Sequence, residues 1–113
     1  MIGFQICKRE RKVDAATAAK FRALPVANIS DSMSRITAGG PRLRPMHGGG
    51  NLAGPAFTVK TRPGDNLMIH KALDIADAGD VIVVDGGGDL TNALIGEMMV
   101  AHAQKRGIAG MVL

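Results

Sequence analysis

The chain has 113 residues, with 14 lysines and arginines against 10 aspartates and glutamates, a formal net charge of +4. This length suits one small domain, and its many large apolar residues exclude a disordered chain. No apolar run approaches the roughly 18 residues of a membrane span, and no signal-peptide stretch is present at the start. The single cysteine, Cys7, excludes an internal disulfide framework and a cysteine-cluster zinc site, so a reduced cytoplasm is the expected location.

Positive charge is concentrated near the amino terminus, where residues 8–12 hold four basic side chains. Such a run can be a nucleic-acid-binding arm. The sequence has no tryptophan, no tyrosine and only three phenylalanines, however, so it offers little for base stacking. We therefore interpret residues 1–13 as a solvated basic lead-in and expect no nucleic-acid partner. The charge could equally attract small anionic substrates.

The first half of the chain predicts two helices. Asp14 is a suitable N-cap for an alanine-rich helix over Asp14–Leu24, which Pro25 ends. Apolar residues at helical spacing predict a second helix over Val26–Ile36. Residues 41–52, rich in glycine and proline, predict a loop or a loose hairpin arm.

The second half alternates strands and helices. Ala53–Thr61 predicts a strand, and Asp65 or Asn66 is expected to cap the helix that follows and ends at Gly79. The β-branched run Val81–Val84 is typical of a strand buried on both faces. A further apolar strand begins at residue 108. We expect residues 80–84 and 108–113 to be neighbouring parallel strands joined by a helix, which is an α/β architecture.

The end of the sequence falls inside that last apolar strand, with no turn after Val112 and Leu113. Buried strands normally continue into another element, and an unpaired strand edge is a liability. We therefore expect the chain to be an amino-terminal portion of a longer protein.

Two segments could bind a ligand. Asp85–Asp89, with three glycines, follows a buried strand, and a plain turn and a ligand loop are equally good interpretations. Gly96 interrupts a helical pattern, so the helix could begin there rather than at Thr91, leaving the amides of Glu97, Met98 and Met99 unpaired and suited to a carboxylate. The alternative is a tolerated glycine against which another element packs closely.

Other chemistry receives little support from the sequence. The histidines at positions 47, 70 and 102 do not pair at metal-binding spacing, and no nucleophile motif is present.

Several segments together carry a resemblance to a known family, the RraA-like proteins. The stretches concerned are Leu24–Met33, Ala53–Val59, Pro63–Leu67 with His70, Ala72 and Leu73, then Gly79–Gly88, and Glu97–Gly110. The resemblance covers about residues 14–113 and implies a single domain, an RraA-like swivelling α/β/β fold that is incomplete at the carboxyl terminus. It also implies assembly as homotrimers or homohexamers.

For function, the resemblance implies a lyase: a metal-dependent class II aldolase that releases pyruvate from 4-hydroxy-4-methyl-2-oxoglutarate or 4-carboxy-4-hydroxy-2-oxoadipate. The family also includes a non-catalytic regulator that binds ribonuclease E, which is the alternative function. An acidic residue at the position of Glu97 favours the aldolase branch.

The same resemblance implies the site residues. The substrate loop corresponds to Gly96, Glu97, Met98 and Met99, whose amides receive pyruvate, and Glu97 is the expected catalytic residue. The cofactor is a divalent cation, Mg²⁺ or Mn²⁺. In the family an Arg-Asp pair follows the acidic residue after twenty intervening residues; its Arg binds the pyruvate carboxylate and its Asp binds the metal. That position lies beyond Leu113, so we expect no metal ligand within this chain and little or no activity from it alone.

Overall fold

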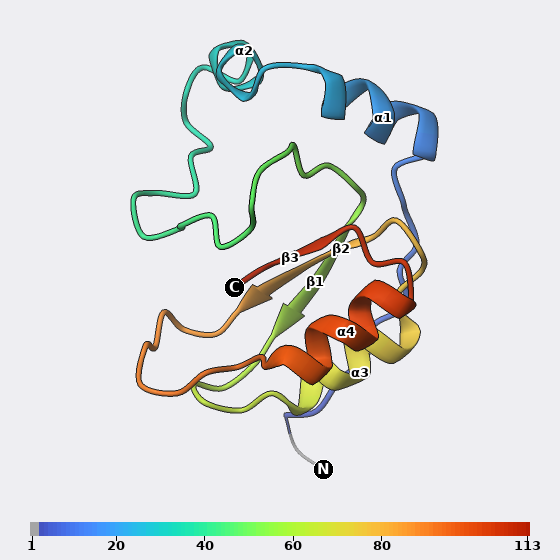
Figure 1. Cartoon of the computed structure of the whole chain (residues 1–113), viewed down its shortest axis with the longest axis vertical. Helices are drawn as coiled ribbons and strands as arrows, with labels where there is room; N and C mark the ends of the chain where they lie inside the picture. Colours follow the sequence, from blue (N-terminus) through green and yellow to red (C-terminus); the bar gives the residue numbers. More distant parts are fainter. Residues whose placement is uncertain (1–2) are drawn as a thin grey trace.

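The computed structural model describes residues 3–113, and its second half forms a layered α/β unit (Figure 1). Three parallel strands, β1 (Ala56–Lys60), β2 (Val81–Asp85) and β3 (Gly110–Val112), pair in the order β1-β2-β3. The helices α3 (Leu67–Ile75) and α4 (Glu97–Lys105) connect consecutive strands and pack together over one face of the sheet. The α/β prediction is confirmed, as is the parallel pairing of the last two strands.

The core lies between this sheet face and the two helices. Ile82 at the centre of β2 is completely buried, and so are Ile69 and Leu73 on α3. The strand prediction for Val81–Val84 is confirmed, because three of its four residues are buried in a strand that has a neighbour on each side. Burial of such side chains, worth about 1.5–3 kcal/mol each, is the main stabilising contribution to this unit.

The first strand is shorter than predicted, because it begins at Ala56 and not at Ala53. Immediately before it, Gly54 lies so close to the carbonyl oxygen of Gly79 that a Cβ atom would overlap it. This close approach brings the chain onto the start of β2, where the amide of Val81 donates to the carbonyl of Pro55 at 2.9 Å. A side chain at position 54 would therefore separate the two segments.

The helices of the first half, α1 (Ala15–Ala23) and α2 (Val26–Ser32), contain no buried residue and lie away from the sheet (Figure 1). The predicted N-cap is confirmed, since Asp14 Oδ1 accepts a hydrogen bond from the amide of Thr17 at 2.8 Å. This bond, reinforced by the Thr17 hydroxyl, lowers the pKa of Asp14. Local capping thus sets the start of α1 without support from packing.

The second helix ends four residues before the predicted end at Ile36. Ser34 and Arg35 have φ values of 58° and 59°, in the left-handed region that stops a right-handed helix. Residues 41–52 contain no strand, so this segment is a loop and not a hairpin arm. Within residues 3–113, none of the helices has the length and apolar character to cross a membrane.

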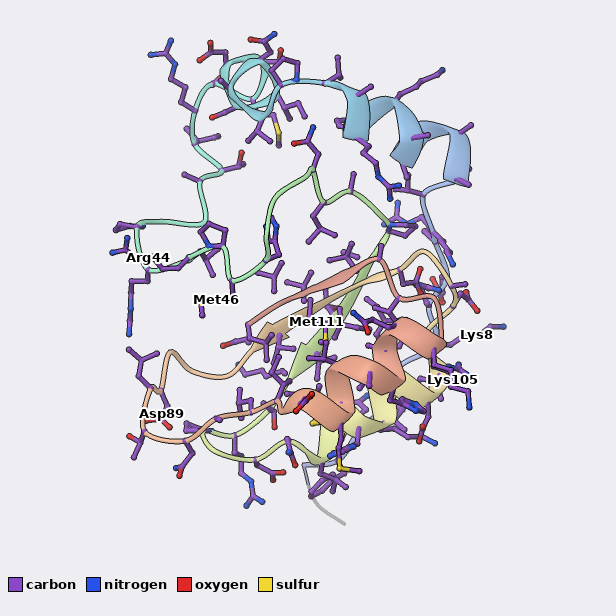
Figure 2. All side chains as sticks on the ribbon, viewed as in Figure 1. Lys8, Arg44, Met46, Asp89, Lys105 and Met111 are labelled. Carbon is purple, nitrogen blue, oxygen red and sulfur yellow. The ribbon has the colours of Figure 1, made fainter. Side chains whose placement is uncertain are left out.

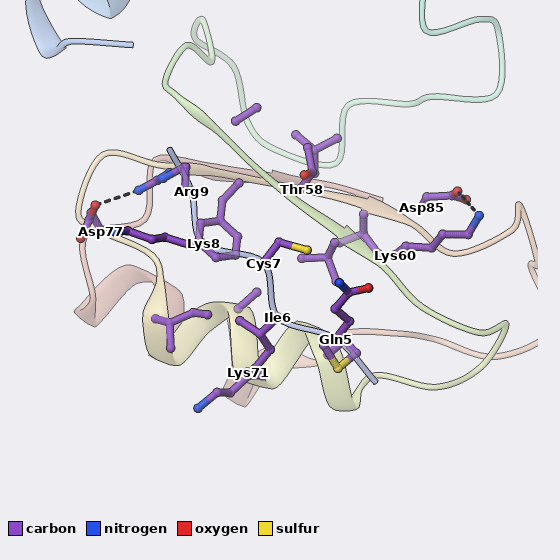
Figure 3. A pocket seen from close by; sticks show the side chains of 18 of the residues that line it. Gln5, Ile6, Cys7, Lys8, Arg9, Thr58, Lys60, Lys71, Asp77 and Asp85 are labelled. Atoms are coloured by element: carbon purple, nitrogen blue, oxygen red, sulfur yellow. Dashed lines mark hydrogen bonds and ion pairs between the residues drawn. The ribbon is translucent and has the colours of Figure 1, made fainter. Parts of the chain in front are cut away.

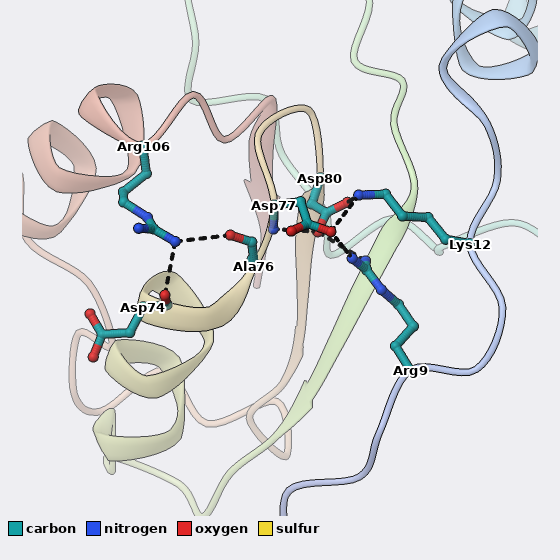
Figure 4. Close-up of polar contacts among 7 residues, drawn as sticks. All are labelled: Arg9, Lys12, Asp74, Ala76, Asp77, Asp80 and Arg106. Carbon is teal, nitrogen blue, oxygen red and sulfur yellow. Dashed lines mark hydrogen bonds and ion pairs between the residues drawn. The ribbon is translucent and has the colours of Figure 1, made fainter.

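Two residues of the basic lead-in are attached to the core. Arg9 and Lys12 form ion pairs with Asp77 and Asp80, in the segment that joins α3 to β2 (Figure 4). The physical reason is that Asp80 is completely buried, and a buried carboxylate requires a compensating cation.

Candidate functional site

The start of α4 is the segment that the sequence singles out as a substrate loop. The helix begins at Glu97, Gly96 is its N-cap, and its first backbone bond runs from the amide of Val100 to the carbonyl of Gly96 at 3.1 Å. Residues 91–96 are not helical. The prediction that the helix starts near Gly96, and not at Thr91, is therefore confirmed.

This start leaves backbone donors available. Among the described residues, the amides of Glu97, Met98 and Met99 have no backbone acceptor, and no side chain caps the helix. The amino-terminal end of a helix carries a partial positive charge, to which these donors contribute. An anion could therefore be bound here by three amides of one chain segment.

Gly96 gives this helix start an open approach. Its φ of −135° and ψ of 177° are extended values that other residues also adopt, so the backbone does not require glycine. A Cβ atom at position 96 would meet no atom within 4 Å, so the alternative of close packing within this chain is wrong. The remaining advantage of glycine is the room that it leaves for a group from outside the chain.

The side chains that follow Gly96 have different environments. Glu97 is exposed, and Met98 is 87% exposed. Met99 is 8% exposed and belongs to the core, while Leu94 and Ile95 are half-buried against that same core. Leu94 and Ile95 thus anchor the loop before α4 to the core, and Met99 anchors the first turn of the helix to the same core.

Asn66 also belongs to this site, and the sequence indicated only a possible cap. Its side chain makes no capping bond to α3; instead its amide nitrogen lies 3.8 Å from the sulfur of Met99. The cap is supplied by Asp65, whose Oδ1 accepts from the amide of Leu67 at 3.0 Å, and Arg62 lowers the pKa of this carboxyl group. A polar amide is therefore placed beside the start of α4.

The amides of Glu97, Met98 and Met99 do not line either of two open grooves on the described part of the chain. One of these grooves reaches Leu94, Ile95 and Val100, which flank the helix start, but neither groove is lined by Gly96 or residues 97–99. The histidines do not gather at the helix start either: His102 lies 3.7 Å from Asp74, and His47 contacts the backbone of Gly49. From this chain, the site consists of backbone donors, one exposed carboxylate and the neighbouring Asn66.

The glycine-rich segment Asp85–Asp89 forms a turn at the carboxyl end of β2. The amide of Gly87 donates to Asp85 Oδ1 at 3.0 Å, and Arg42 donates to the carbonyl of Gly88 at 3.0 Å. One of the two grooves lies beyond this turn, between residues 42–52 and β3; Figure 2 labels Arg44, Met46, Asp89 and Met111 among its lining residues. Local hydrogen bonds therefore hold this turn without a ligand.

The residues present do not form a metal site by themselves. Within residues 3–113, no three histidine, cysteine, aspartate or glutamate side chains lie close enough to hold a metal ion together. Near the free amides, Glu97 is the one acidic side chain in the first turn of α4.

Together these features define an α/β domain with a parallel sheet and a helix amino terminus whose amides are available to an anion. The chain belongs to the RraA-like family, described as Aldolase/RraA, which residues 26–113 match. The RraA-like resemblance is thereby confirmed.

Three similar curated relatives have the name "Putative 4-hydroxy-4-methyl-2-oxoglutarate aldolase". The relative from Halalkalibacterium halodurans is 39% identical over 94 residues, which are 83% of this chain and 45% of that protein. Those from Burkholderia multivorans and Burkholderia mallei are each 45% identical over 73 residues, 65% of this chain and 44% of those proteins. The chain therefore spans less than half the length of the curated relatives it matches.

Proposed function

We propose that this chain carries the pyruvate-binding part of an aldolase that cleaves 4-hydroxy-4-methyl-2-oxoglutarate or 4-carboxy-4-hydroxy-2-oxoadipate. The observation that carries the proposal is the start of α4, where three amides lack acceptors and Gly96 leaves open space. The aldolase names of the relatives support the substrate class. They also favour an enzyme over a ribonuclease E regulator, the alternative that the resemblance offered.

The reaction develops negative charge, which hydrogen-bond donors and a helix amino terminus can stabilise. A base removes the proton of the C4 hydroxyl group, the C3–C4 bond breaks, and its electron pair forms the enolate of pyruvate, which is then protonated. In our proposal the amides of Glu97–Met99 bind the pyruvate carboxylate, so that the positive end of α4 lies beside the developing negative charge. Glu97 accepts or returns a proton, directly or through a water molecule, and Asn66 donates a hydrogen bond beside it.

The metal belongs to the proposal as an expectation from the family resemblance. Mg²⁺ or Mn²⁺ would act as a Lewis acid towards the keto and carboxylate oxygens. Because the described side chains do not form a metal site, we assign no ligand and derive no step through a metal. No Arg-Asp pair follows Glu97 in this sequence. We therefore expect Mg²⁺-dependent pyruvate release by this chain alone to be absent or very weak.

Binding of pyruvate and of oxalate, a planar mimic of its enolate, tests the site directly. In ¹H–¹⁵N NMR spectra, both should shift the amide signals of Glu97, Met98 and Met99. Gly96→Ala should weaken binding by about tenfold, because the new methyl group occupies the approach to the amides. The matched control is Gly48→Ala, which also places a Cβ atom in open space. Shifts confined to other residues, or equal affinities for both variants, would contradict the proposal.

Catalysis requires a second test, in a version of the protein extended to the length of its relatives. Pyruvate release should fall by about 10²-fold or more in Glu97→Gln, which removes the carboxylate with little change in volume. Glu10→Gln, at an exposed position in the lead-in, is the control and should retain activity. Equal rates for the two variants would remove Glu97 from the chemistry.

Assembly and location complete the proposal. Homotrimers or homohexamers are expected from the family resemblance, and α1 and α2 expose apolar side chains, among them Phe21, Leu24 and Val26, which a neighbouring subunit could cover. Sedimentation velocity would measure the oligomer directly. We place the protein in the cytoplasm, in line with its single exposed cysteine.

A further inference from the structure

The amino-terminal residues are attached to the core by a cluster of ion pairs. We name residues 3–12 the strap. Arg9 contacts Asp77 Oδ2 at 2.8 Å and Asp80 Oδ2 at 2.9 Å, while the Lys12 ammonium lies 2.8 Å from Asp77 Oδ2 and 3.0 Å from Asp80 Oδ1 (Figure 4). Two cations of the strap thus share two carboxylates of the segment between α3 and β2. We call these four side chains the latch.

Asp80 makes the latch more than a surface contact. It is completely buried, and its Oδ2 also accepts a hydrogen bond from the amide of Asp77 at 2.9 Å. Its Oδ1 has no hydrogen bond among the described residues, so the ion pair with Lys12 is what compensates this oxygen. Because an unpaired charge is unfavourable in a buried position, detachment of the strap requires water to reach Asp80.

The strap passes in front of the space between β1 and α3 (Figure 3). The Arg9 guanidinium lies 5.2 Å from the centre of the Phe57 ring, a cation–π distance. Residues of the strap, of β1, of α3 and of the end of β2 line one open groove, so the strap lies across this groove from β1. Lys8 and Arg11 belong to this lining but not to the latch.

The outer edge of β1 is unpaired within residues 3–113. The amide of Thr61 donates to the carbonyl of Asp85, and the carbonyl of Pro55 accepts from the amide of Val81. The backbone N–H and C=O groups of the odd-numbered residues therefore point towards β2. The backbone groups of Ala56, Thr58 and Lys60 consequently point to the edge. Such an edge is a template for pairing with another chain, and proteins commonly protect it with basic side chains or a covering segment.

We propose that residues 3–12 form a releasable strap that shields the open edge of β1 and is held by the latch. Arg9 and Lys12 hold the strap down, whereas Lys8 and Arg11 only add charge to it. Release of the latch, by its removal or by high ionic strength, lifts the strap from the groove and exposes the edge.

The single cysteine provides the probe, because Cys7 lies in the strap and is exposed. A nitroxide spin label on Cys7 should give a motionally restricted spectrum in the wild-type chain. Arg9→Gln/Lys12→Gln should raise the mobile fraction about tenfold, in line with the loss of partly buried ion pairs. The matched control is Lys8→Gln/Arg11→Gln, which removes the same charge from the same segment and should keep the restricted spectrum.

A third variant separates strap release from damage to the buried carboxylate. Asp77→Asn removes one partner of both cations at an exposed side chain and leaves Asp80 intact. It should also raise the mobile fraction, with circular dichroism showing a folded chain. The edge is tested by sedimentation velocity, where Arg9→Gln/Lys12→Gln should associate at lower concentration than its charge-matched control. Equal label mobility in all variants, or equal association of the two double variants, would overturn the proposal.

Discussion

The two halves of the chain are stabilised in different ways. Between Pro55 and Leu113, helices and parallel strands enclose a common core in which Ile69, Leu73 and Ile82 are almost completely inaccessible. Between Asp14 and Leu52, α1 and α2 bury no residue, although both carry large apolar side chains. Helix formation is therefore common to both halves, but only the second half has the packing that normally supplies most helical stability.

This difference shows which residues carry the stability of the chain itself. In the second half, a change acts through cavities and overlaps in a close-packed interior. In the first half, it acts through caps and local backbone preferences, because no side chain of α1 or α2 is buried. The predictions below test this contrast in order of decreasing effect.

The largest effect is expected from removing the same side chain in each half. Leu73→Ala should lower the free energy of unfolding by about 3 kcal/mol, because it leaves a cavity in the core. Leu24→Ala, at the exposed end of α1, should cost less than about 1 kcal/mol. Urea unfolding followed by circular dichroism measures both. Equal costs would mean that α1 packs against the core in solution.

A smaller loss should follow from adding a methyl group where the chain has no room. Gly54→Ala should cost about 2 kcal/mol, because its Cβ would overlap the Gly79 carbonyl and push residues 53–55 away from β2. Gly48→Ala, in the loop of the first half, should be nearly neutral because its Cβ would meet no atom within 4 Å. Thermal unfolding measures both variants. Equal shifts of the two melting temperatures would contradict the contrast between the two halves of the chain.

The cap of α1 should have a local effect. Asp14→Ala removes the acceptor of the Thr17 amide and should destabilise the helix by about 1 kcal/mol. Because α1 is not packed, the loss should appear as helix fraying, seen in the NMR chemical shifts of residues 15–18, with an unchanged urea midpoint for the core. A shifted midpoint would show that α1 and the core unfold together.

The smallest effect concerns pH. The hydrogen bond from Lys12, followed by the charge of Arg9, lowers the pKa of Asp77 below its ordinary 3.8, with Asp80 as the other charged neighbour. A lowered carboxyl pKa contributes stability that is present above the unfolded pKa and is lost as the pH falls through the folded value. Asp77→Asn should therefore remove part of the stability difference between pH 7 and pH 3.

Lys12 gives the opposite dependence of stability on pH, because its bonds to Asp77 and Asp80 raise its pKa above 10.5. Its contribution is complete below the unfolded pKa and is lost as the pH rises through the raised value. Both groups are close to solvent, so the changes should be small and should shrink in high salt. Urea midpoints across pH for the wild type, Asp77→Asn and Lys12→Gln would test the loss of stability at low and at high pH.

Local signals allowed much of the fold to be predicted. A capping aspartate before an alanine-rich segment placed α1, and a β-branched run between glycines placed β2. Gly96 indicated the start of α4, because a glycine inside a helical pattern is unfavourable unless the helix begins there. The end of α2 was missed, since no sequence signal announced the left-handed backbone of Ser34 and Arg35.

Of the candidate site, the sequence could predict only the residues that are adjacent in the chain. The run Gly96–Met99 is contiguous, so its sequence pattern together with the family resemblance could identify it. Asn66 could not be assigned, because it reaches Met99 only through the packing of α3 against α4. For the same reason, the ion pairs of Arg9 and Lys12 were not predicted: their partners lie 65–71 residues away.

By itself, the sequence determined the α/β class, the helix starts at Asp14 and Gly96, and the donors that α4 leaves free. These follow from interactions between residues close along the chain, where capping and periodicity act. Only the tertiary structure decided that Asp80 is buried, that the strap supplies its counter-charges, and that the strap and β1 line one groove. Burial and charge compensation depend on which distant segments meet, and that is set by the packing of the whole core.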